Sequence, residues 1–203
     1  MSTIAAAPVV FAPPPEPVRR FTVDEYHRMI HLGILKEDDP VELLEGWIVA
    51  KMLRNPPHDV AVALTQAALS SALPPSWICR GQSAVTTTDS EPEPDVAVVR
   101  GPIRRYVANH PGPADMGLMV EVADSTLARD RTLKARLYAR AAIPIYWIVN
   151  IPDRQIEVYS DVIGADPVEP HYGQRQDFDA SGVVPLILEG RTVAMIPVPD
   201  LLP

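Results

Sequence analysis

The sequence predicts an α/β protein in which a mixed central sheet is flanked by helices. Short apolar runs, rich in β-branched residues and of strand length, occur near residues 82–87, 94–99, 117–123 and 145–151. Amphipathic stretches at residues 58–73 and 126–142 alternate with these runs and have the periodicity of helices. Apolar strands that alternate with amphipathic helices indicate a layered α/β architecture.

The N-terminal third is expected to add a short helix and a strand pair. Thr22 and Glu25 form a capping box, so a helix is predicted from about residue 23 to residue 32. Residues 41–52 are predicted to form a strand, or a hairpin that is broken near Gly46.

The remaining elements follow from turn residues and apolar runs. The strand at 82–87 is expected to be continuous from Trp77, and a further strand is expected at residues 156–159. After Tyr159 the chain is expected to be irregular until a closing hairpin over residues 183–198. Residues 100–116 are expected to form a long loop, and loops of this length near a site often bind substrate.

Two carboxylates stand inside the apolar runs. Asp95 opens the run DVAVV, and Glu121 lies near the end of LMVEV. A buried carboxylate without a partner is costly, so two acids on neighbouring strands predict a shared cation. Mg²⁺ takes one or two carboxylates from a protein and keeps several waters, which suits this pair.

The helix predicted after Glu121 carries a polar stripe. Asp130, Lys134 and Tyr138 recur at four-residue spacing and therefore share one side of the helix, apart from its apolar stripe. Since the apolar stripe packs on the sheet, Lys134 is expected to reach back toward the two acids.

These residues, in this order, resemble a known family. A proline followed by Asp95, then Glu121 on the next strand, then a lysine resembles the PD-(D/E)XK nuclease superfamily. More narrowly, EPDVAVV, EVADSTLARDRTLKARLYA and IPIYWIVN resemble the Uma-two family of restriction-endonuclease-like proteins, over residues 21–203. The superfamily pattern has its lysine two residues after the glutamate, where this chain has Ala123. In this family the lysine stands on the following helix, so the resemblance points to Lys134.

The resemblance implies a restriction-endonuclease-like fold and a metal-dependent DNA endonuclease that hydrolyses phosphodiester bonds. Asp95, Glu121 and Lys134 would be catalytic, and Asp95 and Glu121 would bind Mg²⁺ or Mn²⁺. DNA would be the partner. By analogy with nucleases that pair to cut two strands, the protein would be a homodimer.

Other residues are expected to assist. The resemblance favours Glu42 over Glu45 as a third acid, the alternative being that both face solvent on an edge strand. His58, at a helix N-terminus, either binds phosphate, orients a metal-bound water, or has a local capping role. The remaining accessory residues are Gln82, which interrupts a strand, and Asp130. Arg129 and Arg131 are expected to contact phosphate.

Composition limits the classes of function. The 203 residues suit a single domain over 21–203 behind a flexible, proline-rich tail at 1–20. The sequence has no run of about 18 apolar residues, so no membrane span is expected. Cys79 is the only cysteine, which excludes an intrachain disulfide and fits a reducing cytoplasm.

The net charge of −8 opposes strong non-specific binding to DNA. The basic residues are nevertheless concentrated after Asp95 and after Glu121, beside the expected site. Either this is a phosphate-binding track or it is a solvated helix face. A non-catalytic nucleic-acid or protein binding module on the same fold therefore remains the alternative. Sequence does not separate a DNA nuclease from one directed at RNA.

Overall fold

The structure is a computed structural model that describes residues 17–36, 38–52, 54–164 and 169–203. Most of the tail expected at residues 1–20 therefore lies outside the described residues. None of the helices in the part of the chain that is described has the length and apolarity needed to cross a bilayer.

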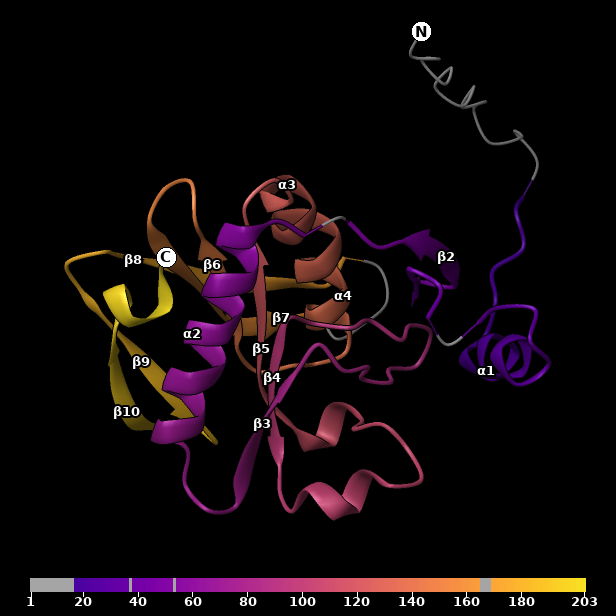
Figure 1. Cartoon of the computed structure of the whole chain (residues 1–203), viewed down its shortest axis with the longest axis horizontal. Helices are drawn as coiled ribbons and strands as arrows, with labels where there is room; N and C mark the ends of the chain where they lie inside the picture. Colours follow the sequence, from indigo (N-terminus) through magenta and orange to yellow (C-terminus); the bar gives the residue numbers. More distant parts are fainter. Residues whose placement is uncertain (1–16, 37, 53, 165–168) are drawn as a thin grey trace, which may run out of the picture.

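A six-stranded mixed sheet forms the centre of the protein (Figure 1). Its strands lie in the order β3-β4-β5-β6-β7-β8, and among them β5 and β6 are the parallel pair, while every other neighbouring pair is antiparallel. The strands are β3 (Trp77–Gly81), β4 (Val96–Arg100), β5 (Met116–Ala123), β6 (Tyr146–Asn150), β7 (Gln155–Ile163) and β8 (His171–Asp179). The predicted α/β class with a mixed sheet is confirmed.

Both faces of the sheet are covered. On one face lie α2 (Pro56–Ala72), the hairpin of β9 (Val183–Leu188) and β10 (Arg191–Pro197), and the short η4 (Val198–Leu201). On the other lie three consecutive helical segments, α3 (Leu127–Arg129), the π-helical η3 (Asp130–Lys134) and α4 (Ala135–Arg140). Figure 1 shows α2 and the C-terminal hairpin on one side of the strands and α4 on the other.

The double coverage explains the sequence of the central strand. Every residue of β5 is buried. Leu118 and Val120 pack into the core beneath α2, whereas Met119 and Ala123 pack into the core beneath α4. A strand buried on both faces needs apolar residues at nearly every position, so a carboxylate at Glu121 is an exception that requires a local reason.

A small N-terminal layer lies at one edge of the molecule. It contains α1 (Val23–His31) and the antiparallel hairpin of β1 (Val41–Leu44) and β2 (Trp47–Ala50). The capping box is present, since the Thr22 hydroxyl accepts from the Glu25 N–H and the Glu25 carboxylate accepts from the Thr22 N–H. The contact between α1 and this hairpin is formed by the buried side chains of Val23, Tyr26 and Leu43.

The strand predicted at residues 82–87 is wrong. β3 ends at Gly81, and Gln82 adopts a left-handed φ of 46° that turns the chain out of the sheet. The following segment folds back on itself, with the Val85 N–H donating to the Pro92 carbonyl at 3.0 Å. Pro92 and Pro94 of the returning segment lack an N–H, so this segment cannot form a regular ladder with residues 82–87 in spite of the β-branched residues there.

The irregular structure predicted after Tyr159 is also wrong. β7 continues to Ile163, and β8 adds an edge strand to the sheet. Most of β8 is exposed and its sequence HYGQRQDFD is polar. A polar edge strand has no apolar alternation, which is the signal on which strand prediction depends.

The long loop between β4 and β5 contains two short 3₁₀ turns, η1 (Ile103–Tyr106) and η2 (Pro113–Asp115).

Two hairpins of the same turn sequence allow a matched stability test. Gly46 and Gly190 each follow a glutamate in a two-residue turn, with φ values of 78° and 73°. A Cβ at Gly46 would lie 2.6 Å from the Arg20 Cβ, whereas a Cβ at Gly190 would meet nothing within 4 Å. Gly190→Ala is expected to lower the free energy of unfolding by about 1–2 kcal/mol through backbone strain alone. Gly46→Ala should cost roughly a further 1–3 kcal/mol through crowding. Urea denaturation measures both, and equal losses would contradict the packing described at Gly46.

Candidate functional site

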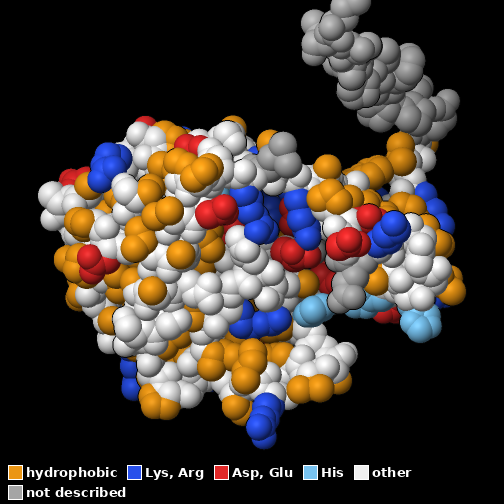
Figure 2. All heavy atoms as spheres, viewed as in Figure 1, with side chains coloured by type: hydrophobic (Ala, Val, Ile, Leu, Met, Phe, Trp, Pro, Cys, Tyr) orange, Lys and Arg blue, Asp and Glu red, His pale blue; other side chains and the backbone are white. Residues whose placement is uncertain are grey.

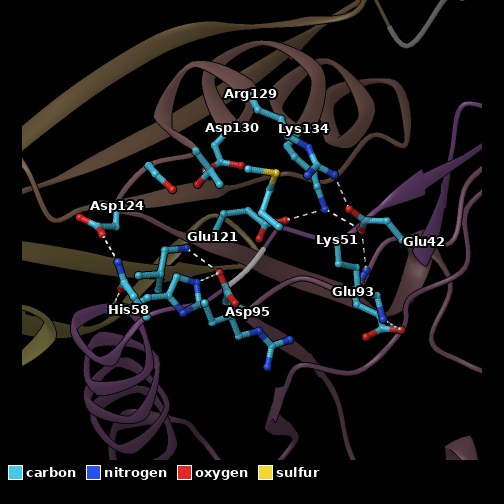
Figure 3. A pocket seen from close by; sticks show the side chains of 16 residues that line it. Glu42, Lys51, His58, Glu93, Asp95, Glu121, Asp124, Arg129, Asp130 and Lys134 are labelled. Atoms are coloured by element: carbon cyan, nitrogen blue, oxygen red, sulfur yellow. Dashed lines mark hydrogen bonds and ion pairs between the residues drawn. The ribbon is translucent and has the colours of Figure 1, made fainter. Parts of the chain in front are cut away.

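A pocket with a volume of about 80 Å³ opens at one end of the central sheet (Figure 3). That volume has room for several water molecules. The segment that leads into β4, strand β5, the N-terminus of α2, the helix that begins after β5, and the β1–β2 hairpin each contribute side chains. The charged residues that line it are Glu42, Lys51, Arg54, His58, Glu93, Asp95, Glu121, Asp124, Arg129, Asp130 and Lys134.

The two predicted carboxylates line this pocket together. Val96 pairs with Val120 in the antiparallel ladder, so one further step of the register sets Asp95 opposite Glu121. Residues directly opposite in such a ladder project their side chains to the same face. Asp95 Oδ2 accepts a hydrogen bond from the Val122 N–H at 2.9 Å, which ties its carboxylate to β5.

Lys134 reaches into the same pocket from the helix. Its Nζ lies 2.9 Å from Glu42 Oε2 and 3.2 Å from Glu121 Oε1, and its side chain is 5% exposed. Burial alone would lower the pKa of Lys134, but the charges of Glu121 and Glu42 outweigh burial and raise it. The protonated form of the lysine is therefore favoured although the side chain is buried.

The π-helical turn helps to align the polar side of this helix. Four residues exceed one α-helical turn of 3.6 residues, so a row at four-residue spacing winds gradually around an α-helix. A π turn closes its hydrogen bonds over five residues, holds more residues per turn and so reduces this drift. Asp130 and Lys134 are the ends of the π turn, and both are buried in the pocket. Tyr138 follows one turn later and donates to Glu121 Oε1 at 2.5 Å.

Glu42, expected as a third acid beside Asp95 and Glu121, lines the pocket. It is 4% exposed, and its carboxylate accepts from Lys134 at 2.9 Å and from Arg129 at 2.5 Å. Glu45 lies in the hairpin turn and accepts instead from Arg136 at 2.8 and 2.9 Å. Both acids are buried, so the alternative that they face solvent on an edge strand is wrong.

The acids of the pocket affect one another. Burial, together with the neighbouring charges of Asp95 and Asp130, raises the pKa of Glu121 to about 8. Burial, with a contribution from the charge of Asp95, raises the pKa of Asp130 to about 6. Carboxylates gathered in a dry volume repel one another, so a site that holds them together favours a proton or a cation.

His58 joins Asp95 from the N-terminus of α2. Its Nε2 lies 3.2 Å from Asp95 Oδ2, and this hydrogen bond raises the pKa of the imidazole. Asn55 caps the helix by accepting from the His58 N–H at 3.1 Å. The cap is therefore supplied by Asn55, and the His58 side chain is left to contact Asp95.

The carboxylate oxygens of the pocket fit a divalent cation such as Mg²⁺. Within the described residues, no three Asp, Glu, His or Cys side chains form a complete metal-ligand group. Mg²⁺ needs only one or two carboxylates because waters complete its coordination. Both Tyr138 and Lys134 contact Glu121 through Oε1, so neither of these contacts occupies Oε2. Asp95 and Glu121 are the residues that would hold the ion.

Two predicted site residues lie elsewhere. The Gln82 side chain is not among those that line the pocket, and the contact of Gln82 with the site is its backbone N–H, which donates to the Asp95 carbonyl at 3.0 Å. Arg131 points away from the pocket and pairs with the buried Glu157, with Nε at 3.0 Å from Oε2. Neighbouring positions on a helix point about 100° apart, which is why Arg131 diverges from Asp130.

Several residues that line the pocket or contact its side chains were not predicted. Tyr138 shares the stripe of Asp130 and Lys134, so its spacing was a usable signal. Lys51 and Glu93 form an ion pair at 2.6 Å at the mouth of the pocket, on segments far apart in the sequence. No local pattern brings such a pair together.

A mixed sheet flanked by helices, with two strand-borne carboxylates and a lysine at one end, defines a restriction-endonuclease-like fold. The chain belongs to the Uma2 family, described as "Putative restriction endonuclease", whose family model matches residues 23–195. A solved structure from Anabaena variabilis ATCC 29413, described as "a putative nuclease belonging to DUF820", shares the fold with a TM-score of 0.66. The two are 18% identical, and the match covers 89% of this chain and 97% of the other. No curated protein matches the chain.

The pKa of Glu121 has a consequence for stability. In the unfolded chain a glutamate titrates near about 4.3, whereas the folded protein holds the proton of Glu121 up to about pH 8. Between these values the folded state binds more protons, so metal-free stability should fall as pH rises.

Glu121→Gln cannot ionise, and it is expected to reduce this slope between pH 5 and 8. Urea denaturation with a chelator present measures it. Glu189→Gln, an exposed carboxylate on the β9–β10 turn, is the matched control and should keep the wild-type slope. A Glu121→Gln slope identical to that of the wild type would contradict the assigned pKa.

Proposed function

We propose that this protein is a metal-dependent endonuclease that hydrolyses phosphodiester bonds of DNA. The observation that carries the proposal is that Asp95 and Glu121 share a pocket of about 80 Å³ with the buried Lys134. The family description supports it, as does the description of the structural neighbour as a "putative nuclease".

In this proposal Asp95 and Glu121 bind Mg²⁺ or Mn²⁺. A divalent ion there would acidify a bound water and stabilise negative charge on the phosphate in the transition state. The Val122 N–H and His58 hold the carboxylate of Asp95 in place, and Tyr138 holds that of Glu121.

Lys134 is suited to stabilise the negative charge that develops on the phosphate in the transition state. Its ammonium group is buried, so its field is weakly screened and acts strongly on charge that forms within the pocket. Glu42 and Glu121 orient the ammonium group. Arg129 is anchored on Glu42 at 2.5 Å and supplies a second cation on the same side.

The first test is nicking of supercoiled plasmid with Mg²⁺, with Mn²⁺ and with a chelator. The wild type should nick only with metal. Asp95→Asn keeps the shape of the side chain but loses its charge, and it should abolish nicking because the ion is no longer held. Asp177→Asn, an exposed acid on β8, is the control and should nick like the wild type. Nicking by Asp95→Asn at the wild-type rate would exclude this pocket as the catalytic site.

The second candidate function is a non-catalytic nucleic-acid or protein binding module on the same fold. The net charge of −8 and the alanine at position 123 favour it. A ligand that binds only the folded state raises the melting temperature. A melting temperature that rises with Mg²⁺ or Mn²⁺, without cleavage of any nucleic acid, would favour the binding module.

The roles of metal and lysine can be separated. Lys134→Ala should bind Mn²⁺ almost as well as the wild type, yet lower kcat by about 10²–10³-fold, the usual effect of removing one charge-stabilising donor. Calorimetric titration and cleavage kinetics measure the two quantities. Because removal of Lys134 leaves the buried Glu42 with Arg129 as one remaining cation, the double variant Glu42→Gln/Lys134→Ala controls for lost stability. Unchanged cleavage by Lys134→Ala would transfer the lysine role to another cation.

The proposal also includes a homodimer, by analogy with nucleases that cut both strands, and a cytoplasmic location. Sedimentation equilibrium of the full chain tests the first. Cell fractionation tests the second.

A further inference from the structure

A second hollow lies between α1 and the loop that connects β4 to β5. Its volume is about 600 Å³, within the range of about 300–1,000 Å³ typical of pockets for small organic groups. The residues that the argument uses are Asp24, His27, Tyr106, Val107, Asn109 and His110, all of which line it.

A short series of contacts links this hollow to the acidic pocket. His27, which lines the hollow, has its Nε2 at 2.7 Å from Glu91 Oε2, and Glu91 pairs through its backbone with Leu43. Leu43 follows Glu42, which lines the acidic pocket. Figure 2 shows acidic and basic side chains gathered in the central hollow of the surface, with histidines next to them.

The loop that forms one wall combines an aromatic ring with positive charge. The Tyr106 hydroxyl donates to the Arg100 carbonyl at 2.7 Å, which fixes the ring, and the guanidinium groups of Arg80 and Arg105 lie 5.7 and 6.0 Å from its centroid. Residues 100–110 contain no acid and three arginines, none of which lines the hollow itself. Arg100 pairs with Glu189 and Arg105 with Asp115, whereas Arg104 is exposed. Val107 in the same loop is 85% exposed.

Resting on the proposed function for the neighbouring site, we propose that this hollow binds an unpaired nucleobase of the strand whose phosphate enters the acidic pocket. Aromatic and apolar side chains stack on bases, and arginines attract the backbone phosphates. His110, Asn109 and Asp24 offer donors and acceptors to the edge of a base. A base inside a duplex is stacked and paired, so only a single-stranded or locally opened substrate fills this hollow.

The test measures binding separately from cleavage. An oligonucleotide that contains the fluorescent base 2-aminopurine is titrated with the full-length protein in the presence of a chelator. Single-stranded oligonucleotide should bind at least about tenfold more tightly than the same strand in a duplex, since stacking on a side chain is worth about 1–3 kcal/mol per base. Equal affinity for the two would overturn the proposal.

Variants locate the subsite. Val107→Glu adds negative charge at an exposed position of the loop and should weaken single-strand binding about tenfold. Val183→Glu is the matched control on β9, at a position 45% exposed that lines neither hollow, and it should bind like the wild type. Tyr106→Leu removes the ring, and its melting curve shows whether the loop remains folded. Equal binding by wild type and Val107→Glu would overturn the subsite.

The two proposals fail in different ways. Single-strand binding that Val107→Glu weakens, without nicking in any metal, would support the subsite and refute the nuclease. Metal-dependent nicking that Asp95→Asn abolishes, with binding that Val107→Glu leaves unchanged, would support the nuclease and refute the subsite.

Discussion

Asp95, Glu121 and Asp130 are buried together in one pocket, and the surrounding elements supply partners that make their burial tolerable. Buried charges are destabilising unless partners and hydrogen bonds compensate them. Lys134 supplies the positive charge, and Tyr138 and Thr126 donate hydrogen bonds to Glu121 and Asp130. The compensation is partial, because the pKa values of both Glu121 and Asp130 remain raised. A divalent cation would complete it, which connects the electrostatics of the fold to the proposed chemistry.

The site depends on segments that are distant in the chain. The β1–β2 hairpin is attached to the helix after β5 by ion pairs of Glu42 with Arg129 and Lys134, and of Glu45 with Arg136 and Arg140. The tight turn at Gly46 sets the position of this hairpin against the N-terminal segment. Loss of the hairpin would leave Lys134 with one fewer partner and open the pocket to water. Stability of the small N-terminal layer and function of the pocket are thus linked.

The central sheet was largely predictable because its signals are local. Apolar runs marked β4, β5 and β6, and an amphipathic period marked α2 and the helix after β5. β8 escaped prediction because it is a polar edge strand. The segment at 82–87 was misassigned because its composition favours a strand, while the left-handed turn at Gln82 and the later prolines prevent one.

The sequence by itself determined that Asp95 and Glu121 stand on neighbouring buried strands, since their apolar surroundings can be recognised within a few residues. It also determined that Lys134 shares a helix side with Asp130. Only the tertiary structure decided that Glu42 completes the ion pair with Lys134 and that Arg131 belongs to Glu157 instead of the pocket. The physical reason is that periodicity is encoded locally, whereas the partner of a buried charge is set by which distant segments exclude water together.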